Sequence, residues 1–274
     1  MLTVHSIQEL QNAKKNHQGT IGFVPTMGAL HEGHLSLIRQ AREENEIVIV
    51  SIFVNPTQFL EGEDLESYPR REKADYKICE LAGVDILFMP TIDDIYEKDE
   101  LKIMAPARGG YVLEGTKRPE HFDGMLQVVM KLLNLSSANK AYFGKKDAQQ
   151  LALITQMVRN YFIPCEIIAC EIIRGERGLA LSSRNAYLSQ EEKERALLIS
   201  ASLKLATQIV LSGEINCNTI KNKMQKLLQE KTDIEYIALV DRDFHSIQTV
   251  ELGNTMILVA VWVGGTRLID NIWI

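Results

Sequence analysis

The sequence predicts an α/β protein: a mostly parallel sheet flanked by helices, followed by a smaller α+β C-terminal domain. Short apolar, β-branched runs alternate with segments of helical periodicity, which is the pattern of βαβ units. After about residue 174 the order changes, and two helical segments precede three strand-like runs. We therefore predict two domains, residues 1–174 and 175–274.

Composition and charge exclude several classes of protein. The 274 residues have a formal net charge of −6, which gives no broad basic field for nucleic acid. No apolar run approaches the ~20 residues of a transmembrane helix, and the start of the chain lacks the basic and apolar regions of a signal peptide. The four cysteines form no CxxC pair, which favours reduced thiols over a zinc site or a disulfide framework. We expect a cytoplasmic protein that binds neither nucleic acid nor membranes.

The first domain should begin with a short helix over residues 6–16. The continuous β-branched run over 46–54 is typical of a strand buried on both faces, and Pro56 follows it because proline cannot continue a central ladder. Residues 91–121 are less regular and form either a lid-like excursion or a small subdomain. The other predicted strands span residues 20–24, 85–89, 140–143 and 165–173, and the other helices span 35–42, 71–81, 124–135 and 147–161.

The second domain should begin with a helix over residues 189–211. Ser189 and Glu192 have the spacing of a capping box, which starts this helix. Gly264 and Gly265 indicate a tight hairpin turn between two strands. A second helix over 219–230 and strands over 235–240, 256–263 and 266–272 complete the domain.

The stretch from Pro25 to His34 joins a strand to a helix through a glycine-bearing turn. Ligands of open α/β sheets bind at such junctions, and the N–H groups of a helix N-terminus favour a phosphate. His31 and His34 lie three residues apart and share one face of the first helical turn. The stretch therefore predicts a phosphate site beside two imidazoles, although taken alone it equally fits two surface histidines that cap a helix.

Two familiar phosphate motifs and one zinc motif are excluded here. Gly28 and Gly33 have P-loop spacing, but His34 and Leu35 stand where that motif needs Lys and then Ser or Thr. A Gly-x-Gly-x-x-Gly fingerprint is absent. The two histidines are i, i+3, whereas a zincin needs i, i+4 ligands.

Three further stretches follow predicted strand ends. Lys145, Lys146 and Asp147 open a helix and could attract an anion. The run Leu181–Asn185 contains two hydroxyls and a guanidinium that can donate to a phosphate chain. Asn55 and Gln58 could orient a small polar substrate. Each stretch in isolation is at least as consistent with an ordinary turn.

Together these stretches resemble a known family. His31-Glu32-Gly33-His34 matches the HxGH signature of adenylyl-transferring α/β enzymes. The whole set, in this order, is similar to the pantothenate synthetase family, and it covers nearly the whole chain. The matching stretches are Pro25–His34, Val54–Phe59, Tyr68–Arg70, Arg118–Phe122, Phe143–Gln150 and Leu181–Asn185.

The resemblance implies a Rossmann-like domain that binds nucleotide and pantoate, and a smaller domain that closes over the ATP site. It implies that ATP and pantoate form pantoyl adenylate with release of pyrophosphate, and that β-alanine then displaces AMP. His31, His34 and Lys146 would be catalytic, with His34 as proton donor; Gln58 and Gln150 would bind pantoate, with Gln58 also binding β-alanine. Tyr68 and His121 belong to the substrate region. The implied ATP-binding residues are Met27, Gly28, Ala29, Leu30, His31, Glu32, Gly33, His34, Gly144, Lys145, Lys146, Asp147, Ile173, Leu181, Ser182, Ser183 and Arg184.

The sequence departs from the family at two positions. Lys145 stands where the family commonly has Glu, so this loop is more basic. Ala74 precedes Asp75 where family members can have paired acids, so we expect no metal ligand from the protein and Mg²⁺ that arrives bound to ATP. The family also implies a homodimer.

Two other functions stay open at this point. One is an HxGH nucleotidylyltransferase that acts on a phosphorylated acceptor. The other is a non-catalytic nucleotide sensor, since a fold does not establish a function.

Overall fold

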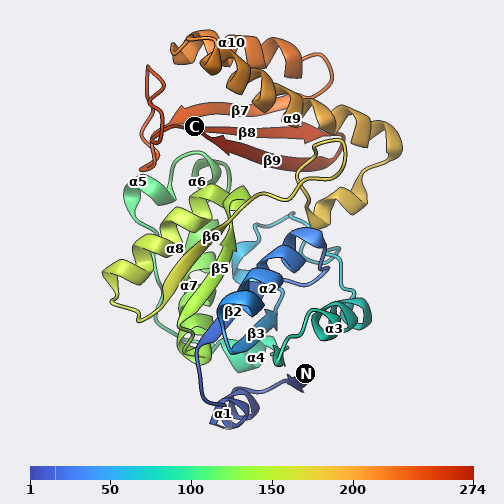
Figure 1. The fold of residues 1–274 in the computed structure, drawn as a ribbon, viewed down its shortest axis with the longest axis vertical. Helices are drawn as coiled ribbons and strands as arrows, with labels where there is room; N and C mark the ends of the chain where they lie inside the picture. The colour runs from blue at the N-terminus through green and yellow to red at the C-terminus, as the bar shows by residue number, and fades with distance from the viewer. Residues whose placement is uncertain (16) are drawn as a thin grey trace. The chain divides into compact units, whose positions relative to one another are not determined.

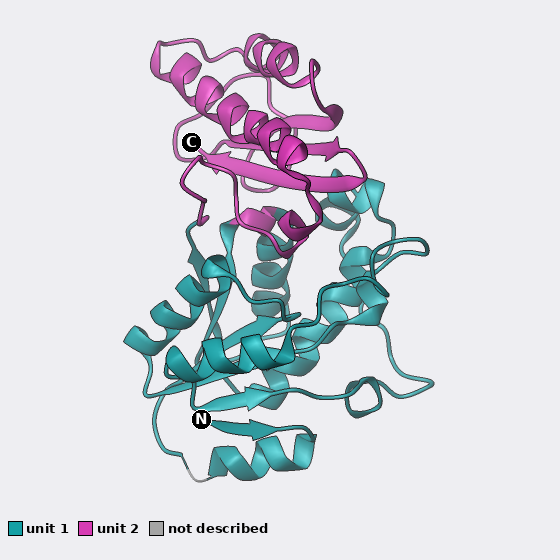
Figure 2. Cartoon of the chain, turned by 90° about the vertical axis from the view of Figure 1, so that its right-hand side faces the viewer, with its two compact units in different colours: residues 1–145, 149–171 teal, residues 146–148, 172–274 magenta. Residues whose placement is uncertain are grey.

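The computed structural model describes residues 1–15 and 17–274, which form two compact units (Figures 1 and 2). Unit 1 comprises Met1–Lys145 and Gln149–Glu171, and unit 2 comprises Lys146–Ala148 and Ile172–Ile274. Each unit has its own sheet and its own hydrophobic core.

Unit 1 contains a six-stranded parallel sheet in the order β1-β4-β3-β2-β5-β6, which confirms the predicted α/β class. The central β3 is buried at every residue, as its β-branched sequence predicts. The edge strand β1 was not predicted, because three residues are too few to show a period. The strands are β1 (Leu2–Val4), β2 (Ile21–Thr26), β3 (Ile47–Ile52), β4 (Ile86–Phe88), β5 (Lys140–Gly144) and β6 (Glu166–Cys170).

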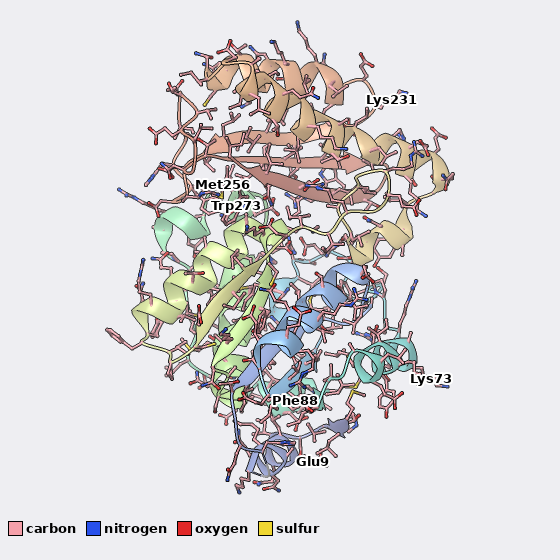
Figure 3. All side chains as sticks on the ribbon, viewed as in Figure 1. Glu9, Lys73, Phe88, Lys231, Met256 and Trp273 are labelled. Carbon is pink, nitrogen blue, oxygen red and sulfur yellow. The ribbon has the colours of Figure 1, made fainter. Side chains whose placement is uncertain are left out.

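The long helices of unit 1 pack on the sheet. Leu37 and Ile38 of α2 pack with Val24 and Val50 of the strands, whereas α7 contacts β2 and α1. Phe88 of β4 is among the largest fully buried side chains (Figure 3). The helices are α1 (Ile7–Lys15), α2 (Glu32–Glu44), α3 (Glu72–Leu81), α7 (His121–Ser136) and α8 (Ala148–Asn160).

Several predicted boundaries need correction. The predicted helix over 6–16 is α1, and its last predicted residue lies outside the described part of the chain. Helix α7 begins at His121 rather than at 124, and the strand predicted to reach 173 ends at Cys170. The segment 91–121, predicted to be irregular, contains three short helices, α4 (Ile92–Ile95), α5 (Ala107–Gly110) and α6 (Glu114–Lys117). Two 3₁₀ turns, η1 (Pro56–Gln58) and η2 (Lys145–Asp147), follow β3 and β5 respectively.

The prediction that Pro25 ends its strand was wrong, since β2 continues to Thr26. The carbonyl of Ile21 accepts from the Asn139 N–H beside β5, while that of Thr26 accepts from the Phe53 N–H after β3. Because main-chain groups alternate along a strand, the nitrogen of Pro25 faces β5, whose pairing with β2 ends at Phe23. The missing N–H therefore breaks no ladder hydrogen bond.

Unit 2 is a smaller α+β unit. Its strands β7 (Asp233–Val240), β8 (Met256–Val263) and β9 (Thr266–Trp273) are antiparallel, and Met256 pairs with Trp273 (Figure 3). The helices α9 (Gln190–Leu211) and α10 (Cys217–Leu228) pack on one face of this sheet. The predicted capping box is present, with the Ser189 hydroxyl accepting from the Glu192 N–H.

All four cysteines are reduced and buried, as predicted. Within residues 1–15 and 17–274, no helix combines the length and the apolar character needed to cross a membrane.

Candidate functional site

The turn between β2 and α2 is tightly built. Gly28 and Ala29 have φ values of 83° and 49°, in the left-handed region. A Cβ on Gly28 would lie 3.1 Å from Cγ2 of Ile52, so glycine suits both the left-handed conformation and the tight space. The Thr26 hydroxyl accepts from the Gly28 N–H at 3.2 Å and donates to the Ser51 carbonyl at 2.8 Å.

Asp75 of α3 holds this turn through two hydrogen bonds, a role that the sequence did not predict. Its two carboxylate oxygens accept from the N–H groups of Ala29 at 2.9 Å and Leu30 at 2.8 Å. The side chain is buried, with 1% of the residue exposed. Burial raises the pKa of this carboxyl, and the two backbone hydrogen bonds oppose that rise. Both carboxylate oxygens of Asp75 are therefore hydrogen-bonded to the main chain of the turn.

His31 and His34 cap α2 reciprocally. Nδ1 of His31 accepts from the Gly33 N–H at 3.1 Å, and Nδ1 of His34 accepts from the His31 N–H at 3.3 Å. The ring centroids lie 4.1 Å apart. Since each Nδ1 accepts, each neutral ring carries its proton on Nε2. The capping role, which the sequence set against a phosphate role, uses Nδ1 of each ring.

Gln58 lies at the end of η1, close to the turn. Its Oε1 accepts from Nδ2 of Asn55 at 3.0 Å, and its Nε2 donates to Sδ of Met27 at 3.4 Å. Asn55 is 1% exposed and also caps η1 by accepting from the Thr57 N–H. The amide pair predicted from the sequence and the histidine-bearing turn are thereby brought together within unit 1.

The other predicted residues of unit 1 lie around the ends of β5 and α8. Gly144 ends β5, and Lys145 forms an ion pair with Glu171. Gln150 lies in the first turn of α8. Its neighbour Gln149 is buried and donates to the carbonyls of Gly109 at 2.6 Å and Val112 at 2.8 Å, so it holds the α5–α6 segment against α8.

The remaining predicted residues belong to unit 2. The Leu181 N–H donates to the Ile173 carbonyl at 3.0 Å, which brings the two predicted apolar residues together. Ser182 caps the 3₁₀ turn η3 (Ser183–Tyr187) by accepting from the Arg184 N–H at 3.3 Å. Lys146 lies 3.6 Å from Asp147, measured from Nζ to Oδ1, and its carbonyl accepts from Nδ2 of Asn271.

The predicted residues thus gather in two groups, one in each unit. The unit 1 group contains Met27, Gly28, Ala29, Leu30, His31, Glu32, Gly33, His34, Gln58, Gly144, Lys145 and Gln150. The unit 2 group contains Lys146, Asp147, Ile173, Leu181, Ser182, Ser183 and Arg184. In residues 1–15 and 17–274, no three His, Cys, Asp or Glu side chains are grouped to hold a metal ion.

Comparison with known proteins identifies the family. The model of the pantoate-beta-alanine ligase family matches residues 2–273. The pantothenate synthetase of Aliarcobacter butzleri is 56% identical over 274 residues, 100% of both chains. That of Aquifex aeolicus is 48% identical over 276 residues, 98% of both.

Solved structures agree with the sequence comparisons. Pantothenate synthetase from Thermus thermophilus has a TM-score of 0.95 and 36% identity over 99% of both chains. Pantoate-beta-alanine ligase from Francisella tularensis, complexed with beta-gamma ATP and beta-alanine, has a TM-score of 0.83 and 38% identity, covering 100% of this chain and 97% of that one. These matches give no support to a nucleotidylyltransferase with a phosphorylated acceptor. The chain belongs to the pantoate–β-alanine ligase family, the ligases that form the amide bond of pantothenate.

Proposed function

We propose that this chain condenses pantoate with β-alanine in two steps, the first of which consumes ATP. In the first, a carboxylate oxygen of pantoate attacks the α-phosphorus of ATP, the new O–P bond forms and pyrophosphate leaves. In the second, the amine of β-alanine attacks the carbonyl carbon of pantoyl adenylate, a C–N bond forms, AMP leaves with the carboxyl oxygen and the amine loses a proton. The Francisella tularensis relative, complexed with beta-gamma ATP and beta-alanine, supports ATP and β-alanine as substrates.

The observation that carries the proposal is the reciprocal cap of His31 and His34. A carboxylate that attacks a phosphate needs positioning and charge neutralisation rather than a protein nucleophile. The N-terminus of α2 supplies backbone N–H groups and the positive end of a helix dipole. Two Nε2–H donors beside it suit the charge that grows on pyrophosphate as it leaves. In this scheme His34 acts as proton donor and His31 as phosphate donor.

We propose the following roles for the other predicted residues. Lys146, with Ser182, Ser183 and Arg184, holds phosphate oxygens through charge-assisted hydrogen bonds. Gln58 and Gln150 bind pantoate, and Gln58 also meets β-alanine. The turn from Met27 to Gly33, residues 144–147, Ile173 and Leu181 line the nucleotide through backbone and apolar contacts.

Mg²⁺ is proposed to enter as part of the nucleotide substrate. A protein ligand for it would need an outward carboxylate, and Asp75 gives both its oxygens to the turn. Magnesium bound to phosphates retains most of its waters and needs no protein cage. We further propose a cytoplasmic homodimer, and sedimentation of the purified chain measures its mass directly.

A three-substrate assay tests the proposal. AMP and pyrophosphate should appear in full turnover only when ATP, pantoate and β-alanine are all present, and ATP with pantoate alone should accumulate a bound acyl adenylate. With ¹⁸O in the pantoate carboxyl, the label should enter AMP after β-alanine is added. Unlabelled AMP would exclude the adenylate route, and binding of ATP without turnover would leave a nucleotide sensor.

A further inference from the structure

The proposed reaction gives the segment Arg118–Phe122 no step of its own, yet two of its side chains converge on Gln58. Nδ1 of His121 lies 2.7 Å from the Gln58 carbonyl oxygen, and Nη2 of Arg118 donates to the same oxygen at 3.3 Å. Because a carbonyl only accepts, Nδ1 of His121 carries the proton. Its Nε2 then accepts from Nη1 of Arg118 at 3.1 Å.

Glu63 completes this arrangement from the loop after η1. Nε and Nη2 of Arg118 donate to its two carboxylate oxygens, each at 2.6 Å, which is the bidentate geometry of a strong pair. The Arg118 and Glu63 side chains are only 14% and 24% exposed. Oε2 of Glu63 also accepts from the Leu60 N–H. We call Glu63, Arg118 and His121 the Gln58 support network.

The protonation states of the network agree with its geometry. Burial, together with the positive charge of Arg118, lowers the pKa of His121 to about 4, so the ring is neutral at neutral pH. Burial raises the pKa of Glu63, but hydrogen bonds and charge from Arg118 outweigh it and hold that pKa below its usual value. The network is therefore one neutral imidazole and one ion pair.

The first turn of α7 supports the same segment by close packing. A Cβ on Gly124 would lie 2.0 Å from the Thr57 carbonyl oxygen, so only glycine fits. The Gly124 carbonyl accepts from Nδ2 of Asn55 at 3.1 Å. Asn55 in turn fixes Oε1 of Gln58.

We propose that Arg118, His121 and Glu63 are positioning residues that set the direction of the Gln58 amide toward a substrate carboxylate. The inference rests on the proposed function, in which Gln58 meets pantoate and β-alanine. Two donors fix the main chain of Gln58 and Asn55 fixes its Oε1, so the amide N–H groups are presented in one direction. A carboxylate is the acceptor that such donors bind, and orientation in advance lowers the cost of binding it.

A double-mutant cycle with Gln58 tests whether the network acts through that residue. Arg118→Ala should raise the KM for pantoate and β-alanine about tenfold, the value of one well-placed hydrogen bond, and leave the KM for ATP within about threefold. In a Gln58→Ala background the same change should add nothing to either KM. A general loss of structure would instead act additively and affect ATP equally.

A variant pair at His121 gives a second readout that does not need Arg118 to be replaced. His121→Asn keeps an N–H donor at the position of Nδ1 and should stay within about twofold of the parent KM values, whereas His121→Leu removes the donor and should match Arg118→Ala. The control is Arg42→Ala, which breaks another ion pair of unit 1, to Asp85 at 2.6 Å, and should leave all three KM values unchanged.

The outcomes separate this inference from the proposed function. Additive effects of Arg118→Ala and Gln58→Ala, or equal effects of the two His121 variants, overturn the inference while turnover of the parent enzyme upholds the function. Parent enzyme that makes no pantothenate overturns both. If Gln58→Ala leaves both KM values unchanged, the inference is overturned together with the proposed role of Gln58.

Discussion

His31 and His34 hold the first turn of α2 by exchanging backbone hydrogen bonds: the His31 N–H donates to Nδ1 of His34 at 3.3 Å, and Nδ1 of His31 accepts from the Gly33 N–H at 3.1 Å. Serine or aspartate would serve equally well as a cap. Histidine differs because it has a second nitrogen on the far side of the ring. The cap therefore aims Nε2 while it stabilises the helix.

Two substitutions at His34 separate these roles. His34→Asn keeps an acceptor at the position of Nδ1 and loses Nε2, so turnover should fall ~10²–10³-fold, as for a lost preorganised donor, with little change in thermal stability. His34→Gln keeps a donor near the position of Nε2 but loses the cap, so it should cost about 1 kcal/mol of unfolding free energy and retain more turnover. If His34→Asn had the same turnover rate as the parent, capping the helix would be the only role of His34.

Asp75 allows a prediction about nucleotide binding. Asp75→Asn retains one acceptor oxygen and points an NH₂ group at one of the two N–H groups of Ala29 and Leu30. One hydrogen bond is lost and two donors oppose each other, so the KM for ATP should rise about tenfold. Lys73→Ala, on the exposed face of the same helix (Figure 3), is the matched control and should behave like the parent. An unchanged KM for ATP would show that the turn holds its shape without the carboxylate.

The site residues that the sequence predicted all follow strand ends. At a strand end, the residue type indicates the chemistry and the local pattern indicates the position in the fold. His31, His34 and Gln58 were found because a strand, a turn and a polar residue occur in one short stretch. The role of Asp75 in fixing the turn was missed because this residue lies 45 positions from Leu30, its hydrogen-bond partner, and because an acidic residue in a helix normally faces solvent. The sequence does place Asp75 on the same face of α3 as Cys79, and these two are the buried residues of that helix.

Some helix and strand boundaries were predicted wrongly for a related reason. Proline after an apolar run predicts a strand end, yet Pro25 continues β2 because its neighbour β5 has already stopped pairing there. Strand order and register depend on contacts between distant residues, and no local pattern contains them. The start of α7 was placed at 124 because Glu120, with φ of 65°, caps nothing with its side chain and leaves no recognisable N-terminal signal.

Gly124 gives a prediction about how α7 supports the amide pair. Gly124→Ala would put a methyl group 2.0 Å from the Thr57 carbonyl oxygen, so η1 or α7 must shift. We expect a loss of about 1–3 kcal/mol in the free energy of unfolding, as for overpacking, and a KM rise for pantoate rather than for ATP. Gly265→Ala has open space around the new methyl group and is the control. Equal stability of the two variants, measured by denaturant unfolding, would show that the contact relaxes without cost.

The buried His121 predicts a pH dependence of stability. Its pKa is lowered to about 4 in the folded protein from 6.5, chiefly by burial and then by Arg118, with the carboxylates of Glu63 and Glu114 opposing. Between these values the unfolded chain binds the proton and the folded protein does not. The free energy of unfolding therefore falls as pH drops from about 6.5 to about 4, by about 3 kcal/mol from this residue.

His121→Asn tests this prediction because it keeps the donor to Gln58 and removes the titrating ring. The difference in unfolding free energy between parent and variant should change by about 3 kcal/mol across that pH range and stay constant above pH 7. Carboxyl groups remote from His121 titrate alike in both proteins and cancel in the difference, whereas Glu63 and Glu114 interact with the charge of the ring. A constant difference throughout would mean that His121 takes up its proton in the folded state near its usual pKa, and that the ring is not held neutral by its surroundings.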